Sequence, residues 1–232
     1  MFKPYYTQTR PYCYDVSMKL LLTSGGLRNP TLFKALLELA GRPAGELKVA
    51  VIPTAMNVEP GDKTWAIEHL ERWQQLGVKQ LDIVDISALS KSQWLPRLAD
   101  SNVIFVGGGN TIHLMTCVND SGLNQELPGL LKDRIYVGVS AGSYIATPDI
   151  SFNTHDSGKL VPEALGLVDF CLQVHMNNPK FLFKTLAEIK ERVQNCPQTV
   201  YGLDDEMAIK IDGDDMTIVG EGQYEKIDNQ SA

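Results

Sequence analysis

A serine in the stretch IYVGVSAGSYIA, residues 135–146, has the surroundings of an enzymatic nucleophile. The motif GVSAG follows a run of apolar, β-branched residues and precedes a helical pattern, which is the context that a GxSxG motif requires. Small neighbours leave room for a tight turn that would project the Ser140 hydroxyl above the edge of a sheet. The amide of Ala141, at the helix start, would then point toward a developing oxyanion. The alternative is an ordinary Gly-rich turn in which Ser140 caps the helix.

A serine hydroxyl becomes an effective nucleophile only when a base removes its proton. His175 follows the apolar run FCLQV, residues 170–174, where a strand ends and a loop opens, so it is the predicted base. Of the other three histidines, His69 lies in a predicted helix, and His113 follows a glycine turn and could line the site. The third, His155, lies in the polar loop NTHDSG.

The carboxylate that orients the histidine has two possible places in the chain. A strand end holds a carboxylate better than a loop does, which favours Asp204 or Asp205 in YGLDDEMAI, directly after a predicted strand. The non-catalytic interpretation is that Asp204, Asp205 and Glu206 form a solvated acidic turn. An α/β-hydrolase arrangement would instead use an acid between serine and histidine, at Asp149, Asp156 or Asp169.

Three consecutive glycines occur in FVGGGNTIHLM, residues 105–115. Glycines after a strand let the backbone approach a substrate and leave amides free to donate hydrogen bonds. Gly108 is therefore the predicted second oxyanion donor, and Gly109 is predicted to contact the substrate backbone. The segment is neither GxGxxG nor a Walker loop, which argues against a nucleotide. Further candidates for substrate contacts, which are equally candidates for helix caps and turns, are Asn110, Thr111, Tyr144 and Asn177.

The elements that must position these residues form a regular pattern. Strands are predicted at 19–23, 47–52, 80–84, 102–106, 135–139, 168–174 and 199–203, and helices at 30–40, 64–75, 110–118, after Ser140 and at 181–193. This alternation is typical of an α/β fold with a mostly parallel sheet, and AIKID and MTIVG predict a late antiparallel hairpin. In such sheets the ligand site lies at the carboxyl ends of the strands.

Length and composition predict one domain. The chain has 232 residues, of which 44% are hydrophobic, and no linker or low-complexity run divides it. We expect a single domain over 18–232 and a loosely attached arm over 1–17, rich in tyrosine and proline. Tyr5, Tyr6 and Tyr12 of this arm could dock on a second copy of the chain, which makes a homodimer possible.

Charge and cysteine usage exclude several classes of protein. The formal net charge is −7 and the basic residues are scattered, which argues against nucleic acid or an anionic membrane as a partner. The four cysteines are widely spaced and form no CxxC pair, and no apolar run is long enough to span a membrane. We therefore expect a cytoplasmic protein with reduced thiols. No HExxH or His/Cys cluster indicates a metal, and no cofactor is expected.

Five segments together resemble one family of enzymes. TSGG on the first strand, FVGGGNTIHLM, GVSAGSYIATP, FCLQVHMNNP and YGLDDEMAI resemble, in this order, the dipeptidase E (α-aspartyl dipeptidase) family of serine peptidases, which includes cyanophycinase. The resemblance spans nearly the whole chain from Met18 onward. It implies a class I glutamine amidotransferase-like fold, an α/β three-layer sandwich, and a Ser-His-Glu triad in that chain order.

Carried over by motif, the triad falls on Ser140, His175 and Asp205, and the oxyanion hole on Gly108 with the amide of Ala141. This chain has an aspartate where the family has glutamate, and Asp204 or Glu206 could take the place of Asp205 as the acid. It also lacks the arginine that, in the family's aspartyl-specific members, follows the histidine in a GETR-like segment. Lys180 or Lys184 could supply a charge there, or could belong to the polar face of the next helix.

The resemblance and the residues together predict a hydrolase that cleaves small peptides, such as dipeptides, through an acyl-enzyme. Two other functions stay open: a non-peptidase acyl hydrolase or transferase on the same scaffold, and a non-catalytic descendant that binds a small peptide or metabolite.

Overall fold

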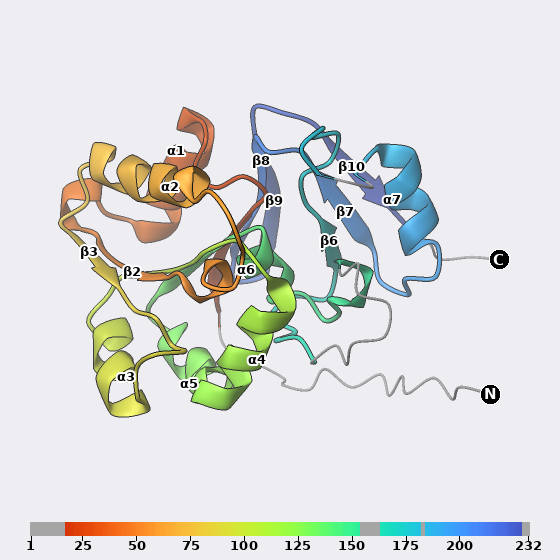
Figure 1. The fold of residues 1–232 in the computed structure, drawn as a ribbon. Coiled ribbons are helices and arrows are strands. Elements are labelled where there is room, and N and C mark those ends of the chain that lie inside the picture. Colours follow the sequence, from red (N-terminus) through yellow and green to blue (C-terminus); the bar gives the residue numbers. More distant parts are fainter. Residues whose placement is uncertain (1–16, 154–162, 182–183, 229–232) are drawn as a thin grey trace.

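A seven-stranded sheet forms the centre of the computed structural model, which describes residues 17–153, 163–181 and 184–228 (Figure 1). The strand order is β3-β2-β4-β5-β1-β8-β9; the first five strands are parallel, and β8 and β9 are antiparallel to their neighbours. The bounds are β1 Lys19–Thr23, β2 Lys48–Ile52, β3 Gln80–Ile83, β4 Val103–Val106, β5 Ile135–Val139, β8 Met207–Asp212 and β9 Asp215–Gly220. The mostly parallel sheet and the late β8-β9 hairpin are thus confirmed.

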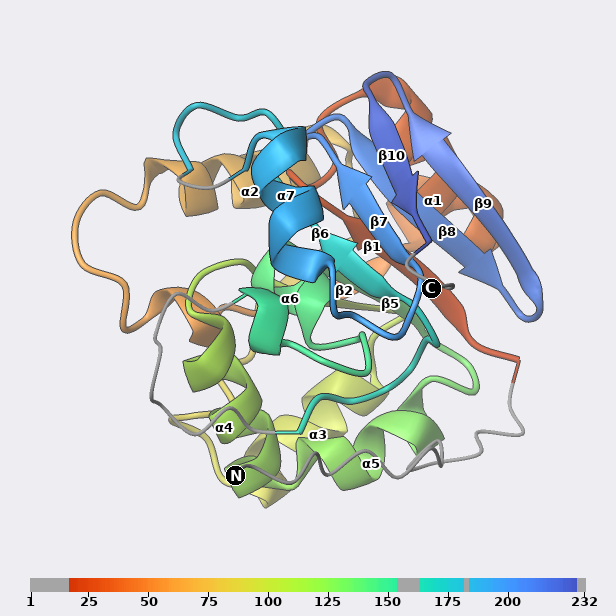
Figure 2. The same ribbon diagram turned by 90° about the vertical axis from the view of Figure 1, so that its right-hand side faces the viewer.

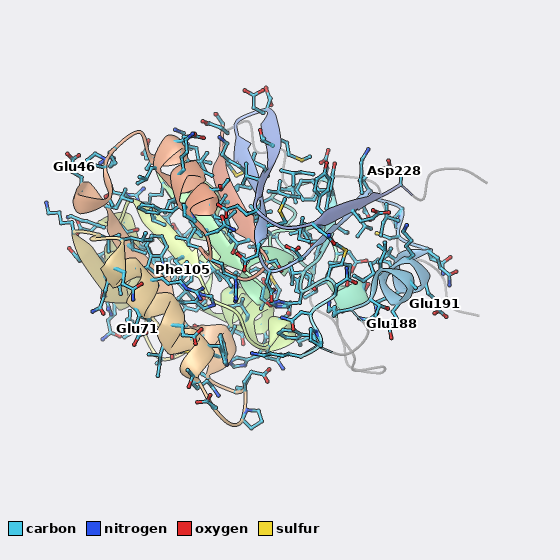
Figure 3. The ribbon with its side chains drawn as sticks, turned by 90° about the horizontal axis from the view of Figure 1, so that it is seen from above. Glu46, Glu71, Phe105, Glu188, Glu191 and Asp228 are labelled. Atoms are coloured by element: carbon cyan, nitrogen blue, oxygen red, sulfur yellow. The ribbon has the colours of Figure 1, made fainter. Side chains whose placement is uncertain are left out.

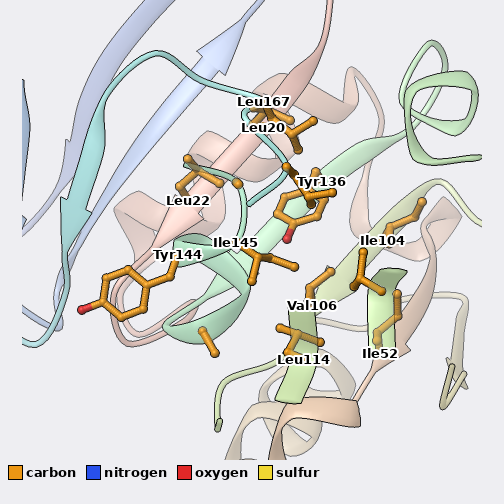
Figure 4. Packing of buried hydrophobic residues seen from close by; sticks show 14 of the residues in the cluster. Leu20, Leu22, Ile52, Ile104, Val106, Leu114, Tyr136, Tyr144, Ile145 and Leu167 are labelled. Atoms are coloured by element: carbon orange, nitrogen blue, oxygen red, sulfur yellow. The ribbon is translucent and has the colours of Figure 1, made fainter. Parts of the chain in front are cut away.

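The parallel strands are apolar on both faces because both faces of the sheet are covered. In β1, Leu20 and Leu22 pack into one core cluster and Leu21 into the other. The first cluster continues through Tyr136 of β5 and Ile104 of β4 (Figure 4). Alternation of side chains along each strand therefore builds two cores, one on each side of the sheet.

Helices complete the outer layers on both sides (Figures 1 and 2). α1 (Pro30–Ala40) and α2 (Thr64–Gln75) pack on one face, while α3 (Lys91–Ala99), α4 (Thr111–Ser121), α5 (Leu123–Leu130) and α6 (Ala141–Tyr144) pack on the other. Under α2, Phe105 of β4 meets Trp73 edge-on at 5.5 Å between ring centroids, and Figure 3 shows this ring in the interior while Glu71 of α2 lies at the surface. The result is a three-layer α/β arrangement.

A second, three-stranded sheet stands beside the first. It has the order β10-β7-β6 and consists of β6 (Cys171–Gln173), β7 (Val200–Leu203) and β10 (Tyr224–Ile227). α7 (Leu186–Val193) covers its outer face through Ile189 and Val193, while Leu172 and Leu203 join the larger core (Figure 2). Short 3-10 turns lie at η1 (Ala44–Glu46), η2 (Thr54–Met56) and η3 (Ser151–Asn153).

Several details differ from the sequence-based expectation. The strands predicted at 168–174 and 199–203 are shorter and belong to the separate small sheet. The helix predicted from 181 starts at Leu186, because Thr185 and Glu188 form a capping box there. The helices α3 and α5 were not predicted, since each contains a proline, Pro96 and Pro128. The N-terminal arm with its tyrosines, together with His155 and Asp156, lies outside the described residues.

Candidate active site

Ser140 occupies a strained turn between β5 and α6. Its backbone has φ 50° and ψ −106°, a conformation that a residue with a side chain rarely adopts. The glycines of GVSAG permit the turn: a Cβ on Gly142 would lie 2.1 Å from the carbonyl oxygen of Val106, and one on Gly138 would lie 2.8 Å from the backbone of Gly142. Ser140 occupies the N-cap position of α6, but its side chain makes no capping hydrogen bond, so the hydroxyl is not engaged in capping the helix.

The end of β1 holds this turn in place. Thr23 donates from its hydroxyl to the Gly138 carbonyl at 2.7 Å, and its own carbonyl accepts hydrogen bonds from the Ser140 amide at 3.2 Å and the Ser143 hydroxyl at 2.7 Å. All of these residues except Ser140 are buried. The central strands β1 and β5, which are paired in register, thus fix the position of the Ser140 hydroxyl.

His175 lies directly against this hydroxyl. Its Nε2 is 2.9 Å from Oγ of Ser140, and it follows β6 with a backbone φ of 62°. The backbone amide of His175 donates to Oγ of Ser24 at 2.8 Å. The phenyl ring of Phe181 stacks on the imidazole, with 3.9 Å between centroids and 5° between planes. Both the backbone and one face of the imidazole are therefore held.

Asp205 lies on the other side of the imidazole. Its Oδ1 is 2.5 Å from Nδ1 of His175 and accepts a hydrogen bond from Oγ of Ser24 at 3.2 Å, while Oδ2 accepts one from Nδ2 of Asn178 at 2.5 Å. Burial alone would raise the pKa of Asp205, but the hydrogen bond and charge of His175, with the Asn178 and Arg28 contributions, lower it to about 2. The carboxylate is therefore ionised at neutral pH, and the shorter aspartate side chain reaches the histidine.

The two alternative acids have other partners. The carboxylate of Asp204 accepts hydrogen bonds from the amides of Glu206 and Gln223, so it stabilises the turn before β8. Glu206 pairs with Nε of Arg28 at 2.8 Å and accepts from Asn29. Of the acids between the serine and the histidine, Asp149 accepts from the Ser151 amide at 2.7 Å.

Backbone strain is concentrated at this site. In the part of the chain that the structure describes, the non-glycine residues with positive φ are Ser140, His175 and Asn177. Each such conformation costs on the order of 1–3 kcal/mol and persists only where surrounding contacts enforce it. Strain of this kind is typical of residues whose side chains are aimed at a substrate.

Two amide groups lie where an oxyanion could be stabilised. Gly107 and Asn110 use their amides to bind the carbonyls of Ile52 and Ala55. Among the described residues, the intervening Gly108 amide has no such partner, and a Cβ on Gly108 would lie 3.3 Å from Cβ of Ser140. Ala141 is the first residue of α6, where an amide has no partner within the helix. The backbone on both sides of the serine can therefore donate hydrogen bonds.

Three of the residues predicted to contact substrate, Gly109, Asn110 and Thr111, form the loop and helix start that follow Gly108. Oδ1 of Asn110 caps α4 by accepting the His113 amide, and Thr111 is half-buried at the start of that helix. Gly109 packs against the backbone of Ala55, where a Cβ would lie 2.3 Å from the carbonyl oxygen. These three residues thus shape the loop beside Gly108.

Tyr144 and Asn177 likewise have structural surroundings. Tyr144 is buried (Figure 4). Its hydroxyl accepts hydrogen bonds from the Val174 amide and from Nζ of Lys184. Asn177 is exposed, and its amide donates to the carbonyl of Lys184. The hydroxyl of Tyr144 is therefore committed to the protein interior.

The other two described histidines, His113 and His69, lie outside the serine-histidine contact. His113 is near Sγ of Cys117 on α4. His69, on α2, packs against Gly26, Trp65 and Phe105, and burial together with the charges of Arg72 and Arg28 lowers its pKa to about 4. Its imidazole is therefore neutral at physiological pH.

Sequence reasoning missed four residues at this site: Ser24, Asn178, Phe181 and Trp65. The sequence contains a signal for the first two, because Ser24 follows β1 directly in TSGG and Asn178 lies in HMNNP after the histidine. Phe181 and Trp65 have none, since each comes to the site through the path of a loop or helix.

No group of three or more His, Cys, Asp or Glu side chains in the described residues is arranged to hold a metal ion. No helix in that part of the chain is long and apolar enough to cross a bilayer.

Comparison with known proteins identifies the family. The model of peptidase family S51 matches residues 20–219. A peptidase E of Salmonella arizonae is 32% identical over 69% of this chain and 70% of its own length, and the uncharacterized peptidase Lmo0363 of Listeria monocytogenes is 33% identical over 57% and 67%. A solved structure described as a peptidase E protein of Listeria monocytogenes EGD-e matches 89% of this chain and 100% of its own, with 25% identity and a TM-score of 0.74. The chain is therefore a peptidase and belongs to peptidase family S51.

Proposed function

We propose that this peptidase cleaves dipeptides or other small peptides through an acyl-enzyme formed on Ser140. His175 acts as the base and Asp205 as the acid that orients it. The observation that carries this proposal is a chain of two hydrogen-bond contacts. Oδ1 of Asp205 lies 2.5 Å from Nδ1 of His175, and Nε2 of His175 lies 2.9 Å from Oγ of Ser140. The peptidase E relatives support the substrate class.

Acylation follows from this geometry. The carboxylate of Asp205 accepts a hydrogen bond from the Nδ1–H of His175, which holds the tautomer whose Nε2 is free to accept the Ser140 proton as Oγ attacks the scissile carbonyl. The amides of Gly108 and Ala141 donate to the oxyanion. Nε2 then gives its proton to the leaving amine, and the acyl group stays on Oγ.

Deacylation uses the same groups in reverse order. A water molecule gives a proton to Nε2 of His175 and attacks the ester carbonyl. The tetrahedral intermediate collapses, Oγ of Ser140 recovers its proton from Nε2, and the carboxylic acid product leaves. Asp205 keeps its negative charge throughout and stabilises the imidazolium that forms in each half-reaction.

Intact-mass labelling with a fluorophosphonate probe tests the proposal, because such a probe reacts with an activated serine without needing the right substrate. We expect stoichiometric labelling of the wild type, none in Ser140→Ala or His175→Ala, and strongly slowed labelling in Asp205→Asn. Asp204→Asn is the matched control and should label like the wild type, since its carboxylate faces backbone amides. Absence of labelling in a folded wild type would refute the proposed triad and favour a non-catalytic peptide-binding protein.

A dipeptide panel run beside chromogenic esters tests the substrate class. Hydrolysis of dipeptides supports a dipeptidase, whereas turnover of esters alone would favour the non-peptidase acyl hydrolase. The cytoplasmic location and the homodimer stay predictions from the sequence, and gel filtration of the full chain tests the latter.

A further inference from the structure

An exposed tryptophan lies beside the predicted oxyanion hole. Trp65, in the first turn of α2, is 36% exposed although its side chain is large and apolar. A Cβ built on Gly108 would lie 3.7 Å from Cζ3 of Trp65 and 3.3 Å from Cβ of Ser140, so the indole edge and the serine lie on the same small surface. A substrate carbonyl that points its oxygen at the Gly108 amide carries its acyl residue past this indole.

A second exposed aromatic ring lies beside the base. Phe181 is 43% exposed and stacks on His175 with 3.9 Å between ring centroids. Because His175 must deliver a proton to the leaving amine, the leaving residue passes close to the imidazole during the reaction. The phenyl ring therefore flanks the leaving side of the scissile bond, as Trp65 flanks the acyl side.

Two of the cations in this region are already engaged. Lys184 is buried, and its Nζ donates to the hydroxyl of Tyr144 and to Oε1 of Gln173. Arg28 pairs with Glu206 at 2.8 Å. Asp205 adds a negative charge, and the whole chain has a formal net charge of −7, which opposes the approach of acidic substrates. Lys180, next to Phe181 in the chain, is exposed, and exposed ion pairs contribute little. An acidic side chain on the substrate would therefore lack a buried counter-ion.

We infer that the substrates of this peptidase have large, uncharged apolar residues on both sides of the scissile bond, with the acyl residue packed on Trp65 and the leaving residue on Phe181. This inference rests on the proposed function. It assigns to Trp65 and Phe181 the selection of substrate, through burial of apolar surface against an indole and a phenyl ring.

Two dipeptide series test the inference in the full-length protein. In the first, the leaving residue is leucine and the acyl residue is phenylalanine, alanine or aspartate. In the second, the acyl residue is phenylalanine and the leaving residue is leucine, alanine or aspartate. We expect kcat/KM in each series to fall in the order given, with about a 100-fold or larger gap between the apolar residue and aspartate, because a carboxylate that packs on an apolar ring loses hydration as well as the apolar contact.

Variants assign each preference to its ring. Trp65→Ala should reduce the ratio of kcat/KM for phenylalanine to that for alanine in the first series by about tenfold, and leave the leucine-to-alanine ratio in the second series unchanged. Phe181→Ala should reduce the leucine-to-alanine ratio in the second series and leave the first series unchanged. Ratios within one variant cancel any general effect on His175. Ile67→Ala is the matched control, since Ile67 is a 54% exposed apolar residue of the same helix α2, and both of its ratios should match the wild type.

The outcomes separate this inference from the function on which it rests. Fluorophosphonate labelling with a preference for aspartate, or with ratios that neither aromatic variant changes, would overturn the inference and leave the serine hydrolase intact. A folded wild type that is not labelled would overturn both. Labelling together with apolar preferences that shift in the two variants as described would support both.

Discussion

Replacing Asn178 should weaken the contact between Asp205 and His175 while both of these residues stay unchanged. Nδ2 of Asn178 donates to Oδ2 of Asp205 at 2.5 Å, and a hydrogen bond to a charged group contributes about 1.5–3 kcal/mol. The Asp205 side chain is 18% exposed, so water can replace part of the loss in Asn178→Ala. We expect the free energy of unfolding to fall by about 1–2 kcal/mol and the pKa of Asp205 to rise from about 2 toward 3.8.

The rate of serine labelling should fall by about tenfold in Asn178→Ala, because about 1.4 kcal/mol of lost alignment corresponds to a factor of ten. Asn178→Asp should label still more slowly, since two carboxylates would face each other. The difference in labelling rate between Asn178→Ala and Asn178→Asp should narrow as the pH falls, because one of the two facing carboxylates in Asn178→Asp then takes up a proton. A residue that only stabilised the fold would not produce this pH-dependent gap.

The matched control is the neighbouring residue Asn177, which is exposed and has φ 59°. Asn177→Gly keeps the left-handed backbone and should label like the wild type. Second-order labelling rates with a fluorophosphonate, measured between pH 6 and pH 9, provide the comparison. Wild-type rates in Asn178→Ala, or an equal loss in Asn177→Gly, would refute the positioning role of Asn178.

Three further predictions concern stability and are measured by urea unfolding. The folded-state pKa of His69 is about 4, below the unfolded value of 6.5, so the unfolded chain binds the proton first as the pH falls. Between pH 7.5 and pH 5 the free energy of unfolding should therefore fall by about 2 kcal/mol more in the wild type than in His69→Gln. Equal pH profiles of the two proteins would contradict this. Gly142→Ala should lower the free energy of unfolding by at least about 3 kcal/mol, because the added Cβ would meet the Val106 carbonyl. Gly129→Ala is the control: no atom lies within 4 Å of its added Cβ, and it should stabilise helix α5 by about 0.5–1 kcal/mol. Lys184→Met should lower stability by about 1–3 kcal/mol, since it removes hydrogen bonds to buried partners; an unchanged midpoint would show that these bonds contribute nothing.

Much of the site could be predicted because it sits where strands end. Ser140 follows β5, His175 closely follows β6 and Asp205 closely follows β7, so an apolar run that stops at a polar residue identifies each of them. The rule that ligands bind at the carboxyl ends of parallel strands then brings the serine and the histidine to one edge. The choice of Asp205 over Asp204 and Glu206 had no basis in local sequence. Neighbouring side chains in an extended segment point in different directions, and the tertiary contacts decide which one meets the histidine.

The contacts around the triad depend on distances between chain segments that sequence patterns do not encode. Asn178 and Ser24 lie on different loops and meet only at the Asp205 carboxylate. Phe181 reaches His175 because the chain turns back after positive-φ residues, which is a property of the folded backbone. The split into two sheets was likewise missed, since the short strand β6 has the same apolar pattern whichever strand it pairs with.

The sequence by itself determined the α/β class, the late hairpin, the serine turn and the resemblance to a family of serine peptidases, because each depends on local periodicity or on a short motif. Tertiary structure decided which acid faces His175, which lysine is buried, and which aromatic rings border Ser140. These outcomes depend on packing between distant segments, where a free-energy difference of one or two kcal/mol selects one side-chain arrangement among several that the local sequence permits equally.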